Sequence, residues 1–228
     1  MAKETVLIIE DDPDIVELLQ YNLEREGYRV LTAEDGEVGL REVQERKPGM
    51  ILLDLMMPGI DGLEVCRQIK SDPATTHLPL IMLTAKSEEI DIVTGLELGA
   101  DDYITKPFSP REVISRVRAV LRRGARAEND TKTRIEIDSV VADSERHEVS
   151  VDGKPLAFTR TEFSLLWTLM KKPGRVYTRS DLVDRITDGE GYILERNIDV
   201  HISAIRKKLT KEHDVIATVH GVGYKCRD

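Results

Sequence analysis

Residues suited to phosphoryl chemistry stand at the ends of four short apolar runs in the first half of the chain: Asp11 and Asp12, Asp54, Thr84, and Lys106. Runs of four or five apolar residues between amphipathic stretches are typical of buried parallel strands, and the carboxyl ends of such strands meet at one edge of a sheet. Three carboxylates at one edge repel one another unless a cation lies among them, and an all-oxygen site suits Mg2+. The sequence therefore predicts that a metal ion, carboxylates and a phosphate meet at this edge.

Each of these residues has a predicted role. Asp54 is the candidate nucleophile, because a carboxylate can accept a phosphoryl group as a mixed anhydride and lose it later to water. Asp11 and Asp12 would hold Mg2+, directly or through water, and Lys106 and the Thr84 hydroxyl would contact phosphate oxygens. Each residue alone could instead be a helix cap, a turn residue or a solvated charge. Their joint placement at four strand ends favours the functional interpretation.

The elements that must position these side chains follow from the alternation of apolar runs with helical periodicity. The alternation occurs five times between Thr5 and about Arg123, which predicts an α/β doubly wound, five-stranded parallel sheet. Helices are expected near residues 14–26, 36–46, 62–71, 88–98 and 109–123. In the last of these, one apolar stripe is formed by Val113, Ile114, Val117, Val120 and Leu121.

Charge and composition divide the chain into two parts. The 228 residues are enough for two domains with separate cores, and the net charge of -9 is unevenly spread. Residues 1–130 carry 16 basic and 26 acidic residues, a net -10, whereas residues 131–228 carry 17 and 16, a net +1. Residues 124–133 are small and polar, which predicts a flexible linker between a domain at 1–123 and a second at 134–228.

The second half reads as strands, then helices, then a terminal hairpin. Strand-like segments lie at residues 135–137, 140–141, 148–151 and 156–158, with Asp152-Gly153 as a hairpin turn. Thr159 and Glu162 form a capping box ahead of a helix, and further helices are expected at 179–186 and 196–209. Residues 215–226 read as two strands joined around His220-Gly221. This order predicts an α+β winged helix-turn-helix domain.

Four segments of the first half together resemble the signatures of two-component receiver domains: Glu10-Asp11-Asp12, residues 53–62, Leu83-Thr84-Ala85 and residues 101–108. The resemblance covers residues 3–123 and implies the flavodoxin-like fold of CheY. It also implies that Asp54 is the phosphoacceptor and that Mg2+ is bound by Asp11, Asp12, Asp54 and the Met56 backbone carbonyl. Lys106 would contact the phosphoryl group, and the Lys106–Pro107 peptide would be cis.

The same resemblance implies a switch and a dimer. Phosphorylation should draw Thr84 toward the new oxygens and turn Tyr103 inward. Receivers of this kind pair through the fourth helix, fifth strand and fifth helix, which implies an interface made by Ile92, Asp101, Asp102, Glu112, Arg116 and Arg118. The expected charge pairs are Asp101 with Arg118 and Asp102 with Arg116. Because Ile92 stands where Glu112 should meet a basic partner, its apolar contact should matter more than usual in the homodimer.

Residues 196–209 resemble the recognition helix of OmpR/PhoB-family response regulators, and residues 218–224 resemble their wing. The face opposite the apolar stripe of this helix, with its flanks, is expected to enter a DNA major groove. The implied DNA-contacting residues are Arg196, Asn197, Val200, His201, Ser203, Ala204, Arg206, Lys207, Lys208, Thr218, His220 and Tyr224. Ser203, Ala204 and His220 depart from the arginines common in relatives, which leaves the target sequence open.

The leading hypothesis is a cytoplasmic, bacterial transcription regulator that a sensor histidine kinase phosphorylates on Asp54. Its partners would be promoter DNA, a second copy of the chain and RNA polymerase, which relatives can touch through the loop at 187–195. No secretory or membrane-spanning segment is expected, and Cys66 and Cys226 are read as reduced structural thiols. One alternative is a Mg2+-dependent phosphohydrolase, although such enzymes usually place a second acid where this chain has Met56. Another is a receiver that works without phosphate.

Overall fold

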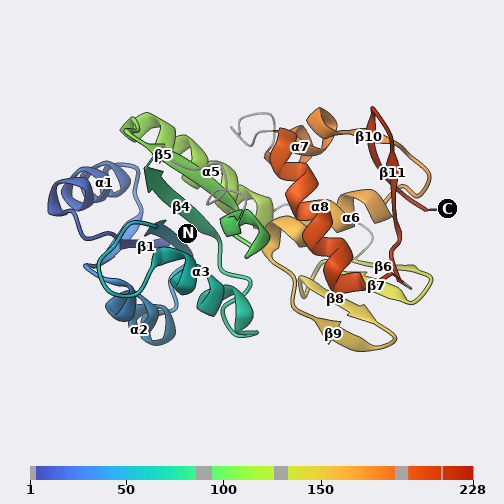
Figure 1. Ribbon diagram of the computed structural model, residues 1–228, viewed down its shortest axis with the longest axis horizontal. Coiled ribbons are helices and arrows are strands. Elements are labelled where there is room, and N and C mark those ends of the chain that lie inside the picture. The colour runs from blue at the N-terminus through green and yellow to red at the C-terminus, as the bar shows by residue number, and fades with distance from the viewer. Residues whose placement is uncertain (1–3, 86–93, 126–132, 188–194, 212, 228) are drawn as a thin grey trace. The chain divides into compact units, whose positions relative to one another are not determined.

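The computed structural model describes residues 4–85, 94–125, 133–187, 195–211 and 213–227 (Figure 1). The chain forms two compact units that divide between Arg118 and Ala119. The predicted linker at 124–133 begins inside a helix that ends at Ala125, and residues 126–132 lie outside the described part. Among the described residues, no helix is both long and apolar enough to cross a bilayer.

The first unit is a five-stranded parallel sheet, as predicted. Its strands run in the order β2-β1-β3-β4-β5. The strands are β1 (Thr5–Ile9), β2 (Arg29–Ala33), β3 (Met50–Asp54), β4 (Leu80–Ala85) and β5 (Asp102–Lys106). The helices are α1 (Pro13–Arg25), α2 (Gly36–Arg46), α3 (Gly62–Ser71) and α5 (Pro110–Ala125), and the last of them continues past the division after Arg118. Of the helix predicted at 88–98, residues 94–97 are helical and residues 88–93 lie outside the described part.

Helices cover both faces of this sheet, which explains why its strands are almost uniformly apolar. Figure 1 shows α1 and α5 on one side and α2 and α3 on the other. Every residue of β3 is buried, as expected for a central strand between two helical layers. Asp12, Asp35 and Asp61 cap the amino ends of α1, α2 and α3, and each side chain accepts a hydrogen bond from a backbone N–H of the first turn.

The second unit combines two antiparallel sheets with three helices. The first sheet has the order β6 (Arg134–Ile137), β7 (Val140–Asp143), β8 (Glu148–Val151) and β9 (Lys154–Leu156). The second has the order β10 (Tyr177–Thr178), β12 (Gly223–Cys226) and β11 (Ile216–Val219). The helices are α6 (Arg160–Met170), α7 (Arg179–Thr187) and α8 (Glu195–Leu209).

Two strands of the second unit differ from the prediction. The segment at 156–158 was expected as a strand, but β9 ends at Leu156 and the Phe158 side chain packs into the core. The chain must leave the sheet there because Thr159 adopts the capping position of α6, where the predicted capping box with Glu162 is present. Strand β10 was not predicted, because two residues are too few to show a strand period.

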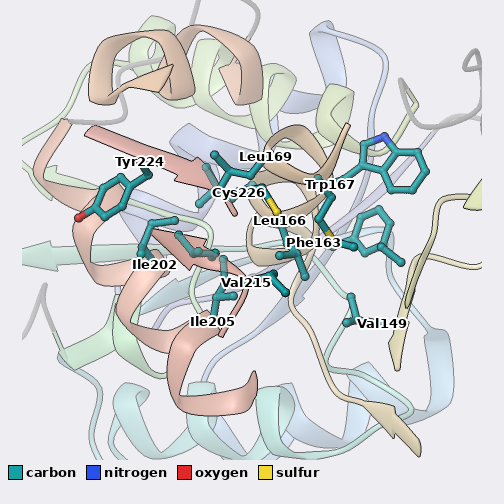
Figure 2. Packing of buried hydrophobic residues seen from close by; sticks show 14 of the residues in the cluster. Val149, Phe163, Leu166, Trp167, Leu169, Ile202, Ile205, Val215, Tyr224 and Cys226 are labelled. Atoms are coloured by element: carbon teal, nitrogen blue, oxygen red, sulfur yellow. The ribbon is translucent and has the colours of Figure 1, made fainter. Parts of the chain in front are cut away.

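The core of the second unit holds the three helices and both sheets together. Figure 2 shows Phe163 and Trp167 of α6, Ile202 and Ile205 of α8, and Cys226 of β12 within this cluster. The Phe163 and Trp167 rings stack with centroids 5.9 Å apart. Cys226 and, in the first unit, Cys66 are free and buried, which confirms their prediction as structural thiols. Burial raises the pKa of the Cys66 thiol to about 11, so this thiol stays protonated and unreactive.

Candidate functional site

Three acids meet at the carboxyl ends of β1 and β3. Glu10 and Asp11 follow β1 directly, and Asp54 is the last residue of β3. One carboxylate oxygen from each lies within 4.8 Å of the others, a spacing at which one cation can bind all three. Glu10 and Asp54 are 1% and 2% exposed, whereas Asp11 is exposed. We call this group of two buried acids and one exposed acid the acidic pocket.

Glu10 takes the place in this pocket that the sequence analysis gave to Asp12. The Asp12 side chain points to the start of α1, where its Oδ1 accepts hydrogen bonds from the backbone N–H groups of Asp14 (2.9 Å) and Ile15 (3.4 Å). That bonding makes Asp12 a helix cap, the ordinary reading of an aspartate before Pro13. The sequence signal for Glu10 was its position as the first polar residue after the apolar run at residues 6–9.

Lys106, at the end of β5, completes the pocket. Its Nζ lies 2.8 and 2.9 Å from the two carboxylate oxygens of Glu10 and 3.0 Å from Oδ2 of Asp54. Burial raises the pKa of Glu10 to about 7, against the opposing effect of its hydrogen bond with Lys106. Burial also opposes the charged form of Lys106, but its hydrogen bonds to Glu10 and Asp54 outweigh that and raise the pKa of the ammonium. Among the described residues, Lys106 pairs with Glu10 and Asp54, and Asp11 adds a third acid to the group. A divalent ion would supply the positive charge that this group lacks.

The remaining predicted residues of this pocket lie around Asp54 and β5. The backbone N–H of Met56 donates to Oδ1 of Asp54 at 3.3 Å. Thr84 is buried and its hydroxyl donates to the Ala85 carbonyl at 3.1 Å. Tyr103 is 7% exposed, so its side chain lies inward. The Lys106–Pro107 peptide is cis, as the resemblance implied.

Helix α8 of the second unit presents a narrower surface than the sequence predicted. Four residues expected to contact DNA are buried: Asn197, His201, Ala204 and Tyr224. Three of them directly precede Ile198, Ile202 and Ile205 in the sequence, so they widen the buried stripe of the helix instead of facing solvent. Tyr224 belongs to the core of the wing hairpin.

The other predicted DNA-contacting residues are divided between solvent and internal bonds. Lys207 and His220 are exposed, and Val200 and Ser203 are half-buried. Arg206 donates to the Ile216 carbonyl and to Oγ1 of Thr218, which ties α8 to β11. Lys208 pairs with the Glu162 carboxylate at 2.5 Å. The Arg196 side chain lies outside the described part of the structure.

Comparison with known proteins agrees with this division into two units. Residues 6–118 match the model of the response regulator receiver domain, and residues 153–226 match that of the carboxyl-terminal domain of transcriptional regulatory proteins. The chain is 44% identical over 226 residues to the phosphate regulon transcriptional regulatory protein PhoB of Pseudomonas aeruginosa, which covers 99% of this chain and 98% of that protein. The chain belongs to the OmpR/PhoB family of response regulators.

Further relatives of this response regulator share its whole length. It is 44% identical to the alkaline phosphatase synthesis transcriptional regulatory protein PhoP of Bacillus subtilis, over 98% of this chain and 96% of that one. Its fold matches the crystal structure of DrrB, an OmpR/PhoB homologue from Thermotoga maritima, with a TM-score of 0.52 at 30% identity over the whole of both chains. A mutant of RitR shares the fold at a TM-score of 0.83 over 99% of both chains. The relatives matched in sequence are transcriptional regulators, not metabolic enzymes.

Asp101 of this response regulator does not lie at the surface that the predicted dimer requires. Its side chain is 0% exposed, and Oδ2 accepts hydrogen bonds from Lys70 Nζ at 3.1 Å and from the Leu80 backbone N–H at 3.0 Å. Its predicted partner Arg118 instead binds the Glu26 carboxylate of the same receiver. The expected pair of Asp101 with Arg118 is therefore wrong, because Asp101 is an internal residue of the receiver core.

The other charged residues of the predicted interface pair with one another inside one receiver. Arg116 binds Asp102 at 2.9 Å and Glu112 at 3.0 Å. Burial opposes the charge of Arg116, but both carboxylates outweigh that and raise its pKa. Ile92 lies outside the described residues. Asp102 and Arg116, which the sequence analysis paired across an interface, are paired within one receiver, and the interface itself stays a prediction.

Proposed function

We propose that this response regulator accepts a phosphoryl group on Asp54 from a sensor histidine kinase in the bacterial cytoplasm. The observation that carries the proposal is the pocket in which Lys106 contacts Asp54 at 3.0 Å beside Glu10 and Asp11. Mg2+ would be held by Glu10, Asp11 and Asp54, with the Met56 backbone carbonyl as a further oxygen ligand. When bound, the ion neutralises charge on the carboxylates and on the transferring phosphoryl group.

In this proposal the protein side chains orient the reactants. A carboxylate oxygen of Asp54 forms a bond to phosphorus while the phosphorus–nitrogen bond of the donor phosphohistidine breaks. Lys106 holds its positive charge next to that oxygen, and the Thr84 hydroxyl turns from the Ala85 carbonyl to a phosphoryl oxygen. Water later attacks phosphorus, which releases inorganic phosphate and restores the Asp54 carboxylate.

The phosphoacceptor assignment predicts an all-or-none result. The wild-type chain incubated with acetyl phosphate and Mg2+ should gain the mass of one phosphoryl group, and Asp54→Asn should gain none, because an amide does not form the mixed anhydride. Asp35→Asn is a matched control, since the Asp35 side chain caps α2 and is not one of the three acids that converge. Intact-protein mass spectrometry measures all three. Full incorporation into Asp54→Asn would refute the assignment.

We further propose that phosphorylation drives the regulator to a homodimer that binds promoter DNA. To move the receiver from about 1% to 99% active, the phosphoryl group and the partner contacts must together favour the active state by ~5.5 kcal/mol. Arg116, Asp102 and Glu112 would then exchange their intrachain bonds for bonds to the second copy. RNA polymerase is the proposed downstream partner at promoters.

DNA recognition is proposed for the exposed side of α8, with the wing near His220. Lys207 is exposed there and would contact a phosphate. Lys207→Ala should weaken DNA binding about three- to ten-fold and lower the slope of log affinity against log salt by ~0.9, the value of one released counterion. Lys154→Ala, which removes the same charge from β9, should change neither. Fluorescence anisotropy over a salt series measures both quantities, and equal effects of the two variants would contradict this placement.

A further inference from the structure

Asp199 places a negative charge on the helix proposed to enter the DNA groove. Its side chain is 47% exposed on α8, between the buried Ile198 and the half-buried Val200. A carboxylate at this position would repel DNA phosphates. The contacts of Asp199 indicate a structural role that offsets this repulsion.

One oxygen of Asp199 joins three elements of the second unit. Oδ1 accepts a hydrogen bond from the Tyr224 hydroxyl of β12 at 2.7 Å and another from Nε of Arg179, the first residue of α7, at 2.8 Å. The Arg179 guanidinium also lies over the Tyr224 ring, 5.2 Å from its centroid. Arg179 is thus held on two sides, by a carboxylate and by an aromatic face.

Among the described residues, Arg179 binds Asp199 through Nε, the inner nitrogen of its guanidinium. The two terminal nitrogens carry the remaining donors of its planar fork, and that geometry matches a phosphate. The hydrogen bond with Asp199 raises the pKa of Arg179, so its charge is permanent. Burial raises the pKa of Tyr224, which keeps its hydroxyl protonated as a donor to Asp199.

We infer that Asp199 is a positioning residue that fixes the Arg179 guanidinium, on the Tyr224 ring, to bind a DNA phosphate at the amino end of α7. The inference rests on the proposed placement of α8 in the DNA groove. Asp199 itself makes no favourable contact with DNA. It increases DNA affinity because it holds the Arg179 guanidinium in a geometry that can bind a phosphate. This gain outweighs the repulsion between the Asp199 carboxylate and the phosphates.

The direction in which Asp199→Ala changes DNA affinity distinguishes this positioning role from a purely electrostatic effect. Asp199→Ala removes a negative charge, so a purely electrostatic effect would tighten DNA binding. We expect the reverse, a loss of about ten-fold, the size of one charge-assisted hydrogen bond. Arg179→Ala should give the same loss, and both variants should lower the salt slope by ~0.9. The double variant should bind no more weakly than Arg179→Ala alone.

The test uses the full chain and a short mixed-sequence DNA duplex, measured by fluorescence anisotropy over a salt series. Asp184→Ala is the matched control, because Asp184 is an exposed acid of α7, and its loss should leave affinity unchanged or slightly tighter. An unchanged Trp167 fluorescence melting curve shows that the fold of each variant is intact. Tighter or unchanged binding by Asp199→Ala, or additive losses in the double variant, would overturn the inference. Wild-type protein without salt-dependent binding would instead refute the proposed DNA-binding surface.

Discussion

Asp101→Ala should lower the free energy of unfolding of the first unit by about 3–5 kcal/mol, because it leaves a buried ammonium without its counter-charge. The Lys70 side chain is 2% exposed. Its Nζ donates to the carbonyls of Leu78 at 2.7 Å and Thr76 at 3.4 Å and pairs with Asp101 at 3.1 Å. The two carbonyls cannot neutralise the charge when the carboxylate is removed, and the Leu80 N–H also loses its acceptor.

The location of the single tryptophan makes this loss measurable in the full chain. Trp167 lies in the second unit, so its fluorescence follows unfolding there and should be unchanged in Asp101→Ala. Hydrogen exchange of the backbone amides of α3 and β4, measured by mass spectrometry, reports the first unit and should become faster. Replacing both partners, Lys70→Met with Asp101→Leu, should destabilise less than Asp101→Ala, since no unpaired charge remains. If Asp101→Ala were as stable as the wild type, Lys70 and Asp101 would not form a stabilising pair.

Glu10→Ala should lower the affinity of the acidic pocket for Mg2+ at least ten-fold, because it removes one of three carboxylates that converge there. Asp12→Ala is the informative comparison. It should leave Mg2+ affinity nearly unchanged and cost about 1 kcal/mol of stability, the usual effect of losing a helix cap. Isothermal titration calorimetry with Mg2+ and thermal unfolding measure the two effects. The opposite pattern would restore Asp12 as the metal ligand and remove Glu10 from the site.

The sequence analysis was most successful where a pattern extends over many residues. The order of the first-unit elements, the five-stranded parallel sheet and the capping box at Thr159 follow from periods and spacings that several residues share. Such patterns are redundant, so one atypical residue does not change them. The juxtaposition of Asp54 and Lys106 follows from the rule that parallel strands end at one edge.

The errors concern adjacent residues of like chemistry. Asp11 and Asp12 are both aspartates before a helix, yet one lies with the acidic pocket and the other caps α1. Asp101 and Asp102 are likewise identical in sequence terms, and only the backbone path sends Asp101 to Lys70 and Asp102 to Arg116. Residue type alone cannot distinguish the roles of two adjacent aspartates, because the local backbone conformation determines which bond each side chain makes.

The misplaced face of α8 has a related cause. A helical projection gives the direction of each side chain around the helix axis. It does not show how much of the helix circumference is covered by neighbouring elements. Helices α6 and α7 both pack on α8, so residues beside the isoleucine stripe, such as His201 and Ala204, are covered as well. Asp199 was not among the predicted DNA-contacting residues, and its bonds to Arg179 and Tyr224 join residues that are distant in sequence.

The bonds of Arg116 inside one receiver bear on how sharply cells could respond to a signal. In the proposed homodimer, a second copy would compete with Asp102 and Glu112 for the Arg116 guanidinium, so encounters between unmodified molecules would gain little from charge. Self-association of unmodified copies through Arg116 would therefore be weak. Transcription caused by chance pairing of unmodified copies would stay low. The increase in transcription after the stimulus arrives would be correspondingly slower.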